Sequence, residues 1–571
     1  MSALTDRIES PELLAKIVPV EEAVKHVANR SVVAISGFTK AGEPKVFLPA
    51  LAKHLAANAP DTRIALFSGA SLADEVENPI APFVSKRGPY MSSPASRKLI
   101  HAGKMDFSDV HLSMFARNLM WGIYGDVDVA VVEVSRIRPD GSVILSSSVG
   151  ISAEALAKAK KIILEVNTAQ PDFTGFHDIA LPAVPPNVGW PIPILNVSDR
   201  VGTPYVPIDT RKVVAVVAST VPDYPVAFKP VSALEVRLAE NVVDFLIHCR
   251  DWLDWQKRLP PIQSGVGNVA NAIVGELYKS PFQKIRFYTE VFQDGMMRYV
   301  EDDEKFDGAS ATAISLSEPA RESFMRQFRK CRDKVVLRPM WLSNSAEVIS
   351  RLFVIAMNTP LEVDIFGHAN STHVDGSKVI NGLGGSGDFF RNAYISIAHT
   401  PSVRRLKDGR TVSCVMPYVR HVDHTEHDIK CLVTEQGYAL NTSIRSARPR
   451  AVDIIEKCAH PHFRPLLRDY LDASGGGDEP RATNISWIEG WWKEYDAACR
   501  EFPASGVAEE RRTKSGGRKA ACNCAYEGRR TNSAAAMSTE RRDVAEPRRL
   551  SPRGAANPSR TSAKTRCSIV Q

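Results

Sequence analysis

An acidic residue stands at the end of a short segment that is predicted to form a strand. Glu290 closes the segment KIRFYTE (284–290), whose large apolar residues predict a buried β-strand. Ligands of open α/β sheets gather at the carboxyl ends of the strands, so a carboxylate in that place faces a crevice. Glu290 could act there as a general base or as a covalent nucleophile. The alternative is a solvated or salt-bridged acid.

A glycine turn lies some twenty residues before this glutamate. Residues 265–270 read GVGNVA and open a segment with helical spacing, NVANAIVGEL (268–277). Such a turn lets backbone amides approach a phosphate or an oxyanion, and the helix N-terminus adds a favourable dipole. The pattern also suits a dinucleotide fold, with Glu290 as the ribose-binding acid. Pro260 and Pro261 argue against the central strand that this fold requires, so we disfavour nicotinamide binding.

A second glycine-rich segment, GSKVINGLGGSG (376–387), is bounded by polar residues. Glycines are needed where a side chain would obstruct close approach of the backbone to a ligand. The segment therefore predicts a binding loop, with a mobile surface loop as the alternative. The residues that could form it are Asn381, Gly382, Gly384, Gly385 and Gly387.

Two clusters raise the question of a bound metal. Residues 421–428, HVDHTEHD, hold three histidines and three acids, but they follow a predicted strand and lack the H-E-x-x-H spacing of a helical zinc site. We interpret them as a hydrogen-bonded turn. Cys522 and Cys524 form a lone C-x-C without a partner pair. No metal site is predicted.

The elements that must position these residues form two series of short apolar runs. In the first half, Val- and Ile-rich runs alternate with helical patterns such as residues 46–59, which predicts a parallel sheet covered on both faces. The predicted strands of this series lie at 31–38, 63–70, 127–135, 161–167 and 212–220. Those of the second series lie at 243–248, 284–290, 334–340, 361–367, 411–419 and 429–437. The sequence thus predicts two α/β domains, 1–225 and 226–503, divided near a proline-rich stretch.

Composition limits the remaining classes of function. The 571 residues carry a formal net charge of +7, yet residues 504–571 alone hold 15 Lys and Arg against 6 Asp and Glu. This tail has few large apolar side chains, so we predict that it is disordered, and we predict no nucleic-acid partner because no aromatic pattern accompanies its charge. No apolar run is long enough to cross a membrane. Nine scattered cysteines and an acidic N-terminal segment favour a soluble cytoplasmic protein, with mitochondria as the minority alternative.

Taken together, these segments resemble one family, the acetyl-CoA hydrolase and succinyl-CoA:acetate CoA-transferase family of class I CoA-transferases. The similarity runs in order over about residues 10–437. It is carried by SGFTKAGEPK (36–45), HLSMF (111–115), ILEVNTAQPDFTGFHDI (163–179), QSGVGNVANA (263–272), TEVFQDGM (289–296), HANSTHVDGSKVINGLGGSGDFFRNA (368–393), HVDHTEHD (421–428) and LVTEQG (432–437).

The resemblance implies two CoA-transferase-like α/β domains with the active site between them, and neither metal nor nicotinamide. The family's catalytic glutamate falls on Glu290, which would attack an acyl-CoA thioester and end as a glutamyl-CoA thioester. The amides near Val266 and Gly385 match the positions that stabilise oxyanions. Asn344, in WLSNSAEVI, resembles the substrate-orienting asparagine.

The same resemblance implies where CoA binds, as a substrate and not as a resident cofactor. CoA would lie along Gly265, Val266, Gly267 and Asn268, and along Asn381 and Gly385. Arg405 is close to a family position that carries a basic residue, and Arg404 or Lys407 could serve instead. The expected partners are an acyl-CoA, a short-chain carboxylate and a second copy of the chain.

The resemblance weakens over YALNTSIRSARPRA (438–451), resumes at 457–472, and ends before WIEGWWKEY and the basic tail.

We expect a transferase that moves CoA between a short-chain acyl-CoA and a small carboxylate, with acetate and succinate as the leading pair. Hydrolysis of acetyl-CoA is the close alternative, because water need only replace the acceptor. A non-catalytic acyl-CoA binder is a further alternative if segment 438–451 displaces the site, and a dehydrogenase is a distant one.

Overall fold

The computed structural model describes residues 2–253, 255, 258–441, 445–480 and 485–502. The tail that we predict to be disordered, with Cys522 and Cys524, lies outside the described residues. Contacts divide the chain into a unit of residues 1–510 and a unit of residues 511–571, and the two α/β halves both belong to the first unit. The proposed boundary at residue 225 falls between the strands of these halves and stays a prediction.

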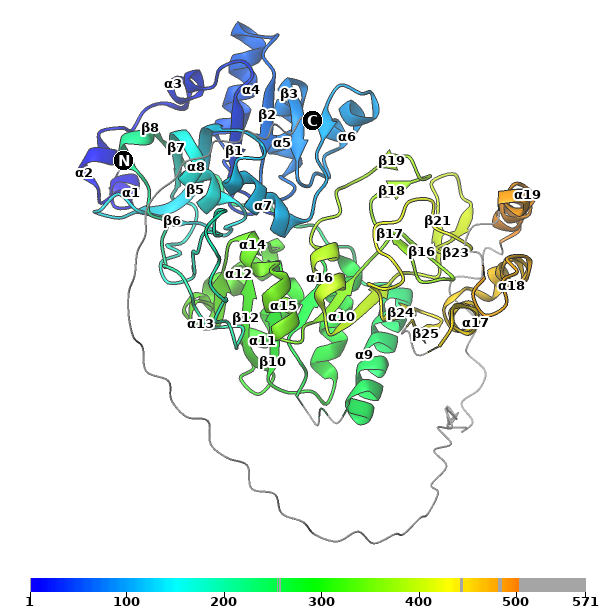
Figure 1. The fold of residues 1–571 in the computed structure, drawn as a ribbon. Helices are drawn as coiled ribbons and strands as arrows, with labels where there is room; N and C mark the ends of the chain where they lie inside the picture. Colours follow the sequence, from blue (N-terminus) through cyan, green and yellow to red (C-terminus); the bar gives the residue numbers. More distant parts are fainter. Residues whose placement is uncertain (1, 254, 256–257, 442–444, 481–484, 503–571) are drawn as a thin grey trace, which may run out of the picture. The chain divides into compact units, whose positions relative to one another are not determined.

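The first half is an eight-stranded sheet in which every pair of strands is parallel except one, the antiparallel pair β5–β6 (Figure 1). Its strands, in spatial order, are β4 (Asp106–Phe107), β3 (Val84–Gly88), β2 (Ile64–Phe67), β1 (Val32–Ile35), β5 (Val127–Ile137), β7 (Ala159–Asn167) and β8 (Val213–Ser219), with β6 (Val143–Leu145) beside β5. Its helices are α1 (Ser2–Thr5), α2 (Pro11–Leu14), α3 (Val20–Ala23), α4 (Phe47–Asn58), α5 (Asp74–Ile80), α6 (Pro94–His101), α7 (Leu112–Trp121) and α8 (Ser152–Lys158).

The first sheet is apolar on both faces, as the unbroken Val and Ile runs predict. Val33 and Ile35 of β1 pack in the same cluster as Leu51 of α4. Ala34, which points to the opposite face because strand side chains alternate, packs in a second cluster with Phe115 of α7. Helices therefore cover both faces of the parallel sheet, and the predicted α/β/α layering of this half is confirmed.

The second half is another eight-stranded sheet, and only its last pair, β24–β25, is antiparallel. Its strands, in spatial order, are β14 (Val335–Leu337), β12 (Phe306–Ala311), β10 (Ile285–Tyr288), β9 (Ile262–Ser264), β15 (Ile355–Asn358), β20 (Ile395–His399), β24 (Cys431–Thr434) and β25 (Gly437–Leu440). Its helices are α9 (Ala233–Leu253), α10 (Asn268–Lys279), α11 (Asp294–Val300), α12 (Glu318–Arg326), α13 (Phe328–Lys334), α14 (Met340–Ser343), α15 (Ala346–Arg351), α16 (Ser386–Asn392), α17 (Ala447–Cys458), α18 (Arg464–Ala473) and α19 (Ile485–Glu501). None of the helices in the described part of the chain is long and apolar enough to cross a membrane.

Smaller sheets decorate the second half. They are β11 (Val291–Phe292) with β13 (Ala313–Ile314), β16 (Glu362–Asp364) with β17 (Ala369–Asn370) and β23 (Val415–Met416), β18 (His373–Val374) with β19 (Lys378–Val379), and β21 (Val403–Arg405) with β22 (Thr411–Ser413). The runs predicted as strands at 361–367 and 411–419 belong to these small sheets and not to the main one. Five strands of the main sheet were not predicted, namely β9, β12, β15, β20 and β25.

Two sequence interpretations are wrong. The run at 243–248 is not a strand but the middle of α9, where Leu238, Val242 and Leu246 recur at helical spacing and are buried. A short apolar run is consistent with either a strand or a helix. Here the helical spacing of apolar residues over the longer segment 233–253 identifies the run as part of a helix. Pro260 and Pro261 do not prevent a central strand either, because β9 begins at Ile262 and pairs with β10 and β15. Both prolines lie before the first paired residue of β9, at positions where the sheet requires no backbone N–H donor.

The two halves are joined through a buried ion pair. Arg338, which follows β14, pairs with Asp178, which lies beyond β7 in the first half, and neither side chain is exposed. Asp178 also accepts hydrogen bonds from the amides of Val201 and Gly202, at 2.9 and 2.6 Å. Arg338 donates to the hydroxyl of Ser310 at 2.7 Å, so the guanidinium is fully enclosed by partners.

We predict that Arg338→Met lowers the free energy of unfolding by about 3–5 kcal/mol, because it leaves the Asp178 carboxylate buried without its counter-charge. Chemical denaturation checks this prediction. Arg211→Met is the matched control, since Arg211 is 88% exposed in its pair with Asp209 and such pairs contribute about 0–1 kcal/mol. Equal losses in the two variants would contradict the role given to the buried pair.

Candidate active site

A cavity of about 380 Å³ lies where the two halves meet, and Glu290 lines it. The first half contributes the loop Phe38–Lys40 and Ser71, among others. The second half contributes the turn at Gly265 and Val266 and the segment 381–386. The crevice that the sequence predicts at the carboxyl end of strand 284–290 is therefore closed by residues from far along the chain.

Glu290 sits in the short connection between β10 and β11. Its carbonyl accepts hydrogen bonds from the amides of Thr312 and Ala313, at 2.8 and 3.1 Å. The carbonyl of Thr312 accepts in turn from the amide of Val149 at 2.8 Å, and its hydroxyl accepts from the amide of Gly150 at 3.1 Å. Backbone amides of the first half therefore fix the position of Thr312, and Thr312 in turn fixes the backbone of Glu290.

The carboxylate of Glu290 is poorly solvated, although it keeps a small exposed surface on the cavity. Desolvation raises its pKa to about 7, and the negative charge of Asp388 acts in the same direction. The amide of Asn344, which is fully buried, donates to the Glu290 carboxylate at 2.9 Å and opposes this rise. The hydroxyl of Ser343 donates to the other end of the Asn344 amide at 2.7 Å, which fixes its orientation. Glu290 is poised to change protonation state near neutral pH.

Gly385 lies against this carboxylate. A Cβ atom at position 385 would stand 1.9 Å from Oε1 of Glu290 and 2.4 Å from Nδ2 of Asn344. The backbone of Gly385 has an ordinary right-handed conformation, with φ −89°, so lack of space and not conformation demands glycine here. Gly385 precedes α16, and the predicted binding loop therefore meets the predicted catalytic acid.

Residues Phe38, Thr39 and Lys40 of the first half also line the cavity, in a tight turn that ends at Ala41. Thr39 and Lys40 both adopt left-handed backbone conformations, with φ 51° and 70°. For residues other than glycine this conformation costs roughly 1–2 kcal/mol each. Two hydrogen bonds between Phe38 and Ala41 close the turn, and the hydroxyl of Ser315, from the second half, donates to the carbonyl of Thr39 at 2.6 Å. Both halves therefore hold this strained turn at the rim of the cavity.

Three other polar residues at or near the cavity were not predicted from the sequence, namely Tyr90, Ser71 and Asp388. Tyr90 lines the cavity, and burial together with the charge of Glu290 raises the pKa of its phenol to about 12. Ser71 also lines it and is buried. Asp388 lies behind Glu290 and accepts from the amide and hydroxyl of Ser113 at 3.0 and 2.6 Å. Ser71 lies outside the segments that carry the family resemblance, and only an alignment or a structure could single it out.

The remaining predicted residues fall into two groups. Gly265, Val266 and Asn381 line the cavity, and Val266 is 48% exposed overall. Gly267 and Asn268 do not line it, since Asn268 instead hydrogen-bonds the backbone of Lys229. Arg405 is exposed in β21, and neither it nor Arg404 or Lys407 lines the cavity. The roles of these residues in binding remain predictions.

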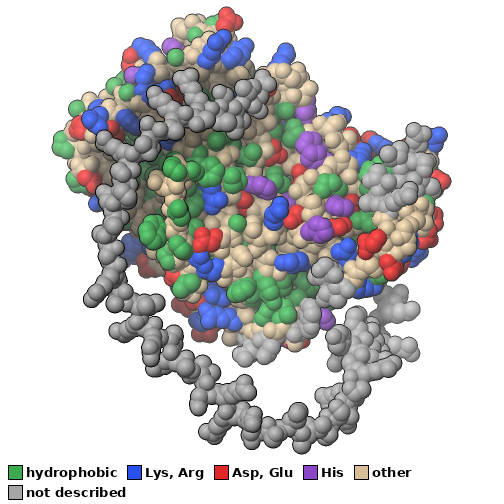
Figure 2. Space-filling view, viewed as in Figure 1, with side chains coloured by type: hydrophobic (Ala, Val, Ile, Leu, Met, Phe, Trp, Pro, Cys, Tyr) green, Lys and Arg blue, Asp and Glu red, His purple; other side chains and the backbone are tan. Residues whose placement is uncertain are grey.

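The histidine-rich run forms hydrogen-bonded turns beside the cavity. The amide and hydroxyl of Thr425 donate to Asp428, and the Asp423 carboxylate accepts from Ser371 and Thr372. Figure 2 shows several histidine side chains on one face, and the rings of His373 and His421 are in contact, with centroids 3.8 Å apart and planes tilted by 33°. Within the described ranges, no three His, Cys, Asp or Glu side chains are grouped so that they could hold a metal ion.

Comparison with known proteins gives two matching family models. Residues 1–218 match the acetyl-CoA hydrolase/transferase N-terminal domain, and residues 321–471 match the corresponding C-terminal domain. An acetyl-CoA hydrolase of Schizosaccharomyces pombe is 42% identical over 500 residues, which cover 84% of this chain and 95% of the relative. A succinyl-CoA:acetate CoA-transferase of Clostridium kluyveri is 39% identical over 489 residues, which cover 84% of this chain and 90% of the relative.

Solved structures share the fold. RipA from Yersinia pestis superposes with a TM-score of 0.63 at 22% identity, over 81% of this chain and 98% of RipA. A 4-hydroxybutyrate CoA-transferase from Porphyromonas gingivalis gives a TM-score of 0.55 at 19% identity, over 81% and 98% of the two chains. The predicted CoA-transferase-like α/β fold is confirmed.

Asn344→Leu is expected to raise the pKa of Glu290 further, by on the order of one unit, because the lost hydrogen bond stabilises only the charged carboxylate. Infrared titration checks this by following the band of the protonated carboxyl group that disappears in Glu290→Gln. Ser350→Leu, in α15 away from the cavity, serves as the control. A Glu290 band with the same midpoint in Asn344→Leu and the parent chain would contradict the assignment.

Proposed function

The chain belongs to the acetyl-CoA hydrolase/transferase family, and we propose that within this family it transfers CoA between a short-chain acyl-CoA and a small carboxylate. Acetate and succinate are the leading pair of carboxylates. The observation that carries the proposal is the desolvated Glu290 carboxylate, held by Asn344 against Gly385 in a cavity between the halves.

The ionised carboxylate of Glu290 begins the reaction as the nucleophile. One of its oxygens attacks the thioester carbonyl, the C–S bond breaks, and CoA leaves as the thiolate. The mixed anhydride between the acyl group and Glu290 is then attacked at the glutamyl carbonyl by the same thiolate. This second step releases the acyl group as a free carboxylate and leaves a glutamyl-CoA thioester on the protein.

The acceptor then repeats these steps in reverse. Its carboxylate attacks the glutamyl carbonyl and expels the CoA thiolate, which forms an anhydride between Glu290 and the acceptor. The thiolate attacks the acceptor's carbonyl, the new acyl-CoA departs, and Glu290 returns as a carboxylate. No net proton is consumed, because each carboxylate or thiolate that is used is replaced by another.

Each attack passes through an oxyanion, which needs fixed hydrogen-bond donors. We assign this role to the amides of Val266 and Gly385, and removal of one such donor typically costs about 2.7–4 kcal/mol. Asn344 orients the nucleophile and stabilises its charge, as its hydrogen bond to Glu290 supports. Tyr90, whose raised pKa keeps the phenol protonated, is available as a further donor toward the cavity.

We propose that CoA lies along the turn of Gly265, Val266, Gly267 and Asn268 and along Asn381 and Gly385. Gly265, Val266, Asn381 and Gly385 support this as cavity-lining residues. Arg405 would contact the CoA phosphates outside the cavity. Binding of this remote part of CoA can be used to orient the thioester against Glu290.

Hydrolysis of acetyl-CoA is the second candidate, and the similarity to the Schizosaccharomyces pombe acetyl-CoA hydrolase favours it. Water would then replace the acceptor carboxylate at the glutamyl carbonyl. Desolvation of Glu290 favours transfer, because it reports scarce water at the reacting group. None of the described residues within 438–451 lines the cavity, which argues against the alternative that this segment displaces the site and leaves a non-catalytic acyl-CoA binder.

We further propose that the protein is a homodimer and that it is located in the cytoplasm, with mitochondria as the alternative location.

Acetyl-CoA mixed with the purified protein is expected to leave CoA covalently bound to the peptide that contains Glu290, as peptide mass spectrometry detects. Addition of succinate or acetate should remove the adduct and yield the corresponding acyl-CoA. Glu290→Gln should form no adduct. Consumption of acetyl-CoA to free CoA, at the same rate with or without acceptor, would favour the hydrolase.

Gly385→Ala is expected to lower the rate of adduct formation at least 100-fold, because a methyl group at this position would overlap the Glu290 carboxylate. The rate is measured by rapid-quench mass spectrometry, with circular dichroism to check folding. Gly275→Ala is the matched control, since a Cβ atom there meets open space on α10. If Gly385→Ala reacted as fast as Gly275→Ala, the proposed packing would be wrong.

The rate of adduct formation should depend on pH through Glu290 itself. Burial raises the pKa of Glu290 to about 7, so below this pH the carboxyl group is protonated and cannot attack. We expect the single-turnover rate to rise about tenfold per pH unit below pH 7 and to level off above it. A rate that stays flat from pH 5.5 to 8 would exclude titration of the nucleophile in this range.

A further inference from the structure

Two residues give the cavity its formal charge. Among the described residues that line it, Glu290 is the only Asp or Glu and Lys40 is the only Lys or Arg. Lys40 belongs to the strained turn of the first half, and its side chain is half-buried. No carboxylate of the described residues lies within ion-pair distance of its ammonium group. The cavity therefore holds a nucleophile and an unpaired cation.

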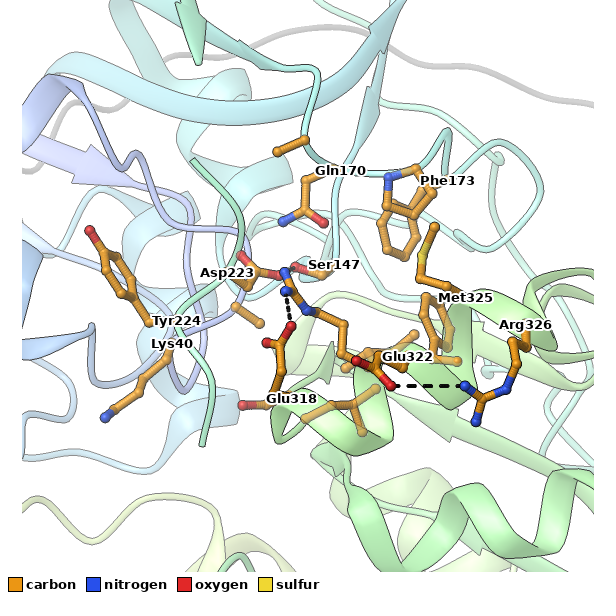
Figure 3. Close-up of a pocket in the computed structure, with 18 residues that line it drawn as sticks. Lys40, Ser147, Gln170, Phe173, Asp223, Tyr224, Glu318, Glu322, Met325 and Arg326 are labelled. Carbon is orange, nitrogen blue, oxygen red and sulfur yellow. Dashed lines mark hydrogen bonds and ion pairs between the residues drawn. The ribbon is translucent and has the colours of Figure 1, made fainter. Parts of the chain in front are cut away.

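Lys40 also borders a second cavity, of about 400 Å³, whose acids have other partners. Glu318 pairs with Arg321 at 2.6 Å, Glu322 lies 4.0 Å from Arg326, and Asp223 pairs with the buried Lys45 at 2.8 Å. Figure 3 shows the amine of Lys40 directed away from Glu318 and Glu322. The acids of this second cavity therefore leave Lys40 free.

Lys40 is not the counter-ion of Glu290. The pKa of Glu290 responds to its burial, to Asn344 and to Asp388, and Lys40 is not among these influences. The two charged residues thus line one cavity without forming an ion pair with each other. A linear acid with a carboxylate at each end could present one end to Glu290 and the other to Lys40.

The backbone at Lys40 is fixed more firmly than a surface lysine requires. The paired hydrogen bonds of Phe38 with Ala41 and the bond from Ser315 to Thr39 hold the turn from both halves. A fixed backbone limits the volume that the flexible side chain can search. Lys40 and Ser315 line both cavities, so the fixed turn lies where the two cavities adjoin.

We propose that Lys40 is a specificity-determining residue whose ammonium group binds the distal carboxylate of a dicarboxylic substrate while the proximal carboxylate reacts at Glu290. The inference rests on the proposed transferase function and names the substrate class that this cavity favours, a short aliphatic dicarboxylate such as succinate. A monocarboxylate such as acetate has no group for Lys40 and gains nothing from it.

The test compares succinate with butyrate, an acceptor of the same carbon number in which a methyl group replaces the distal carboxylate. Acetyl-CoA is the donor, and the new acyl-CoA is measured by chromatography for the parent protein, Lys40→Gln and Lys40→Arg. Arg326→Gln is the matched control, because Arg326 lines only the second cavity and is paired there. Formation of the Glu290 adduct from acetyl-CoA is followed in every variant.

In Lys40→Gln we expect kcat/KM for succinate to fall about 10- to 100-fold, mainly through KM, which corresponds to the loss of a charge-assisted hydrogen bond. Butyrate transfer and adduct formation should change less than twofold. Lys40→Arg should recover most of the succinate activity, and Arg326→Gln should match the parent. Equal losses for succinate and butyrate, or no loss for either, would overturn the proposal.

Failure of the proposed function itself gives a different result, because the parent protein then forms no adduct at Glu290. Calorimetric titration of succinate into the parent and Lys40→Gln proteins still decides whether Lys40 binds a dicarboxylate. Tighter binding by the parent supports the assignment of Lys40. Equal binding of succinate by the two proteins would overturn it.

Discussion

The structure depends on keeping one carboxylate in a place where water solvates it poorly. Moving Glu290 out of water raises its pKa toward neutrality, and the protein must supply what water no longer does. Asn344 supplies one hydrogen bond, and Ser343 holds that amide in the correct orientation. The lack of a side chain at Gly385 supplies the room. A hydrated carboxylate would need none of these features, but its shell of water would also have to be removed before it could attack a thioester.

This constraint explains why two similar α/β halves are joined in one unit. The strand that ends at Glu290 is anchored through Thr312 to Val149 and Gly150 of the first half. Asp388 behind the glutamate is held by Ser113, again from the first half. The buried pair of Asp178 with Arg338 fixes the halves together at a position where any sliding would leave a charge unpaired. Either half alone would expose Glu290 to solvent.

Sequence patterns predict the parts of this arrangement that rest on local periodicity. Strand β10 and the glutamate at its end follow from an apolar run, and helix α10 follows from the spacing after the glycine turn. The run at 243–248 misleads because four or five apolar residues suit a strand as well as the middle of α9. Tyr90, Ser71 and Lys40 enter the cavity only through long-range packing, which no pattern within the first half contains. Asn344 was found through the family resemblance alone. The glycine-rich run identified Gly385 as part of a binding loop, but nothing in its neighbourhood indicates contact with Glu290.

The charge of Lys40 bears on the choice between transfer and hydrolysis. An unpaired cation beside a poorly solvated site loses part of its hydration, a cost that folding alone does not require. In the hydrolysis of acetyl-CoA, neither the acetyl group nor the attacking water carries a charge that Lys40 could bind. A carboxylate acceptor does carry a charge, and in the proposed mechanism it binds when Glu290 is an uncharged glutamyl-CoA thioester. The distal carboxylate of a dicarboxylic acceptor would then have no counter-charge among the described residues of the cavity except Lys40. Lys40 can bind that distal carboxylate because it is not already paired with Glu290. The arrangement therefore fits an enzyme whose second substrate is a carboxylate better than one whose second substrate is water.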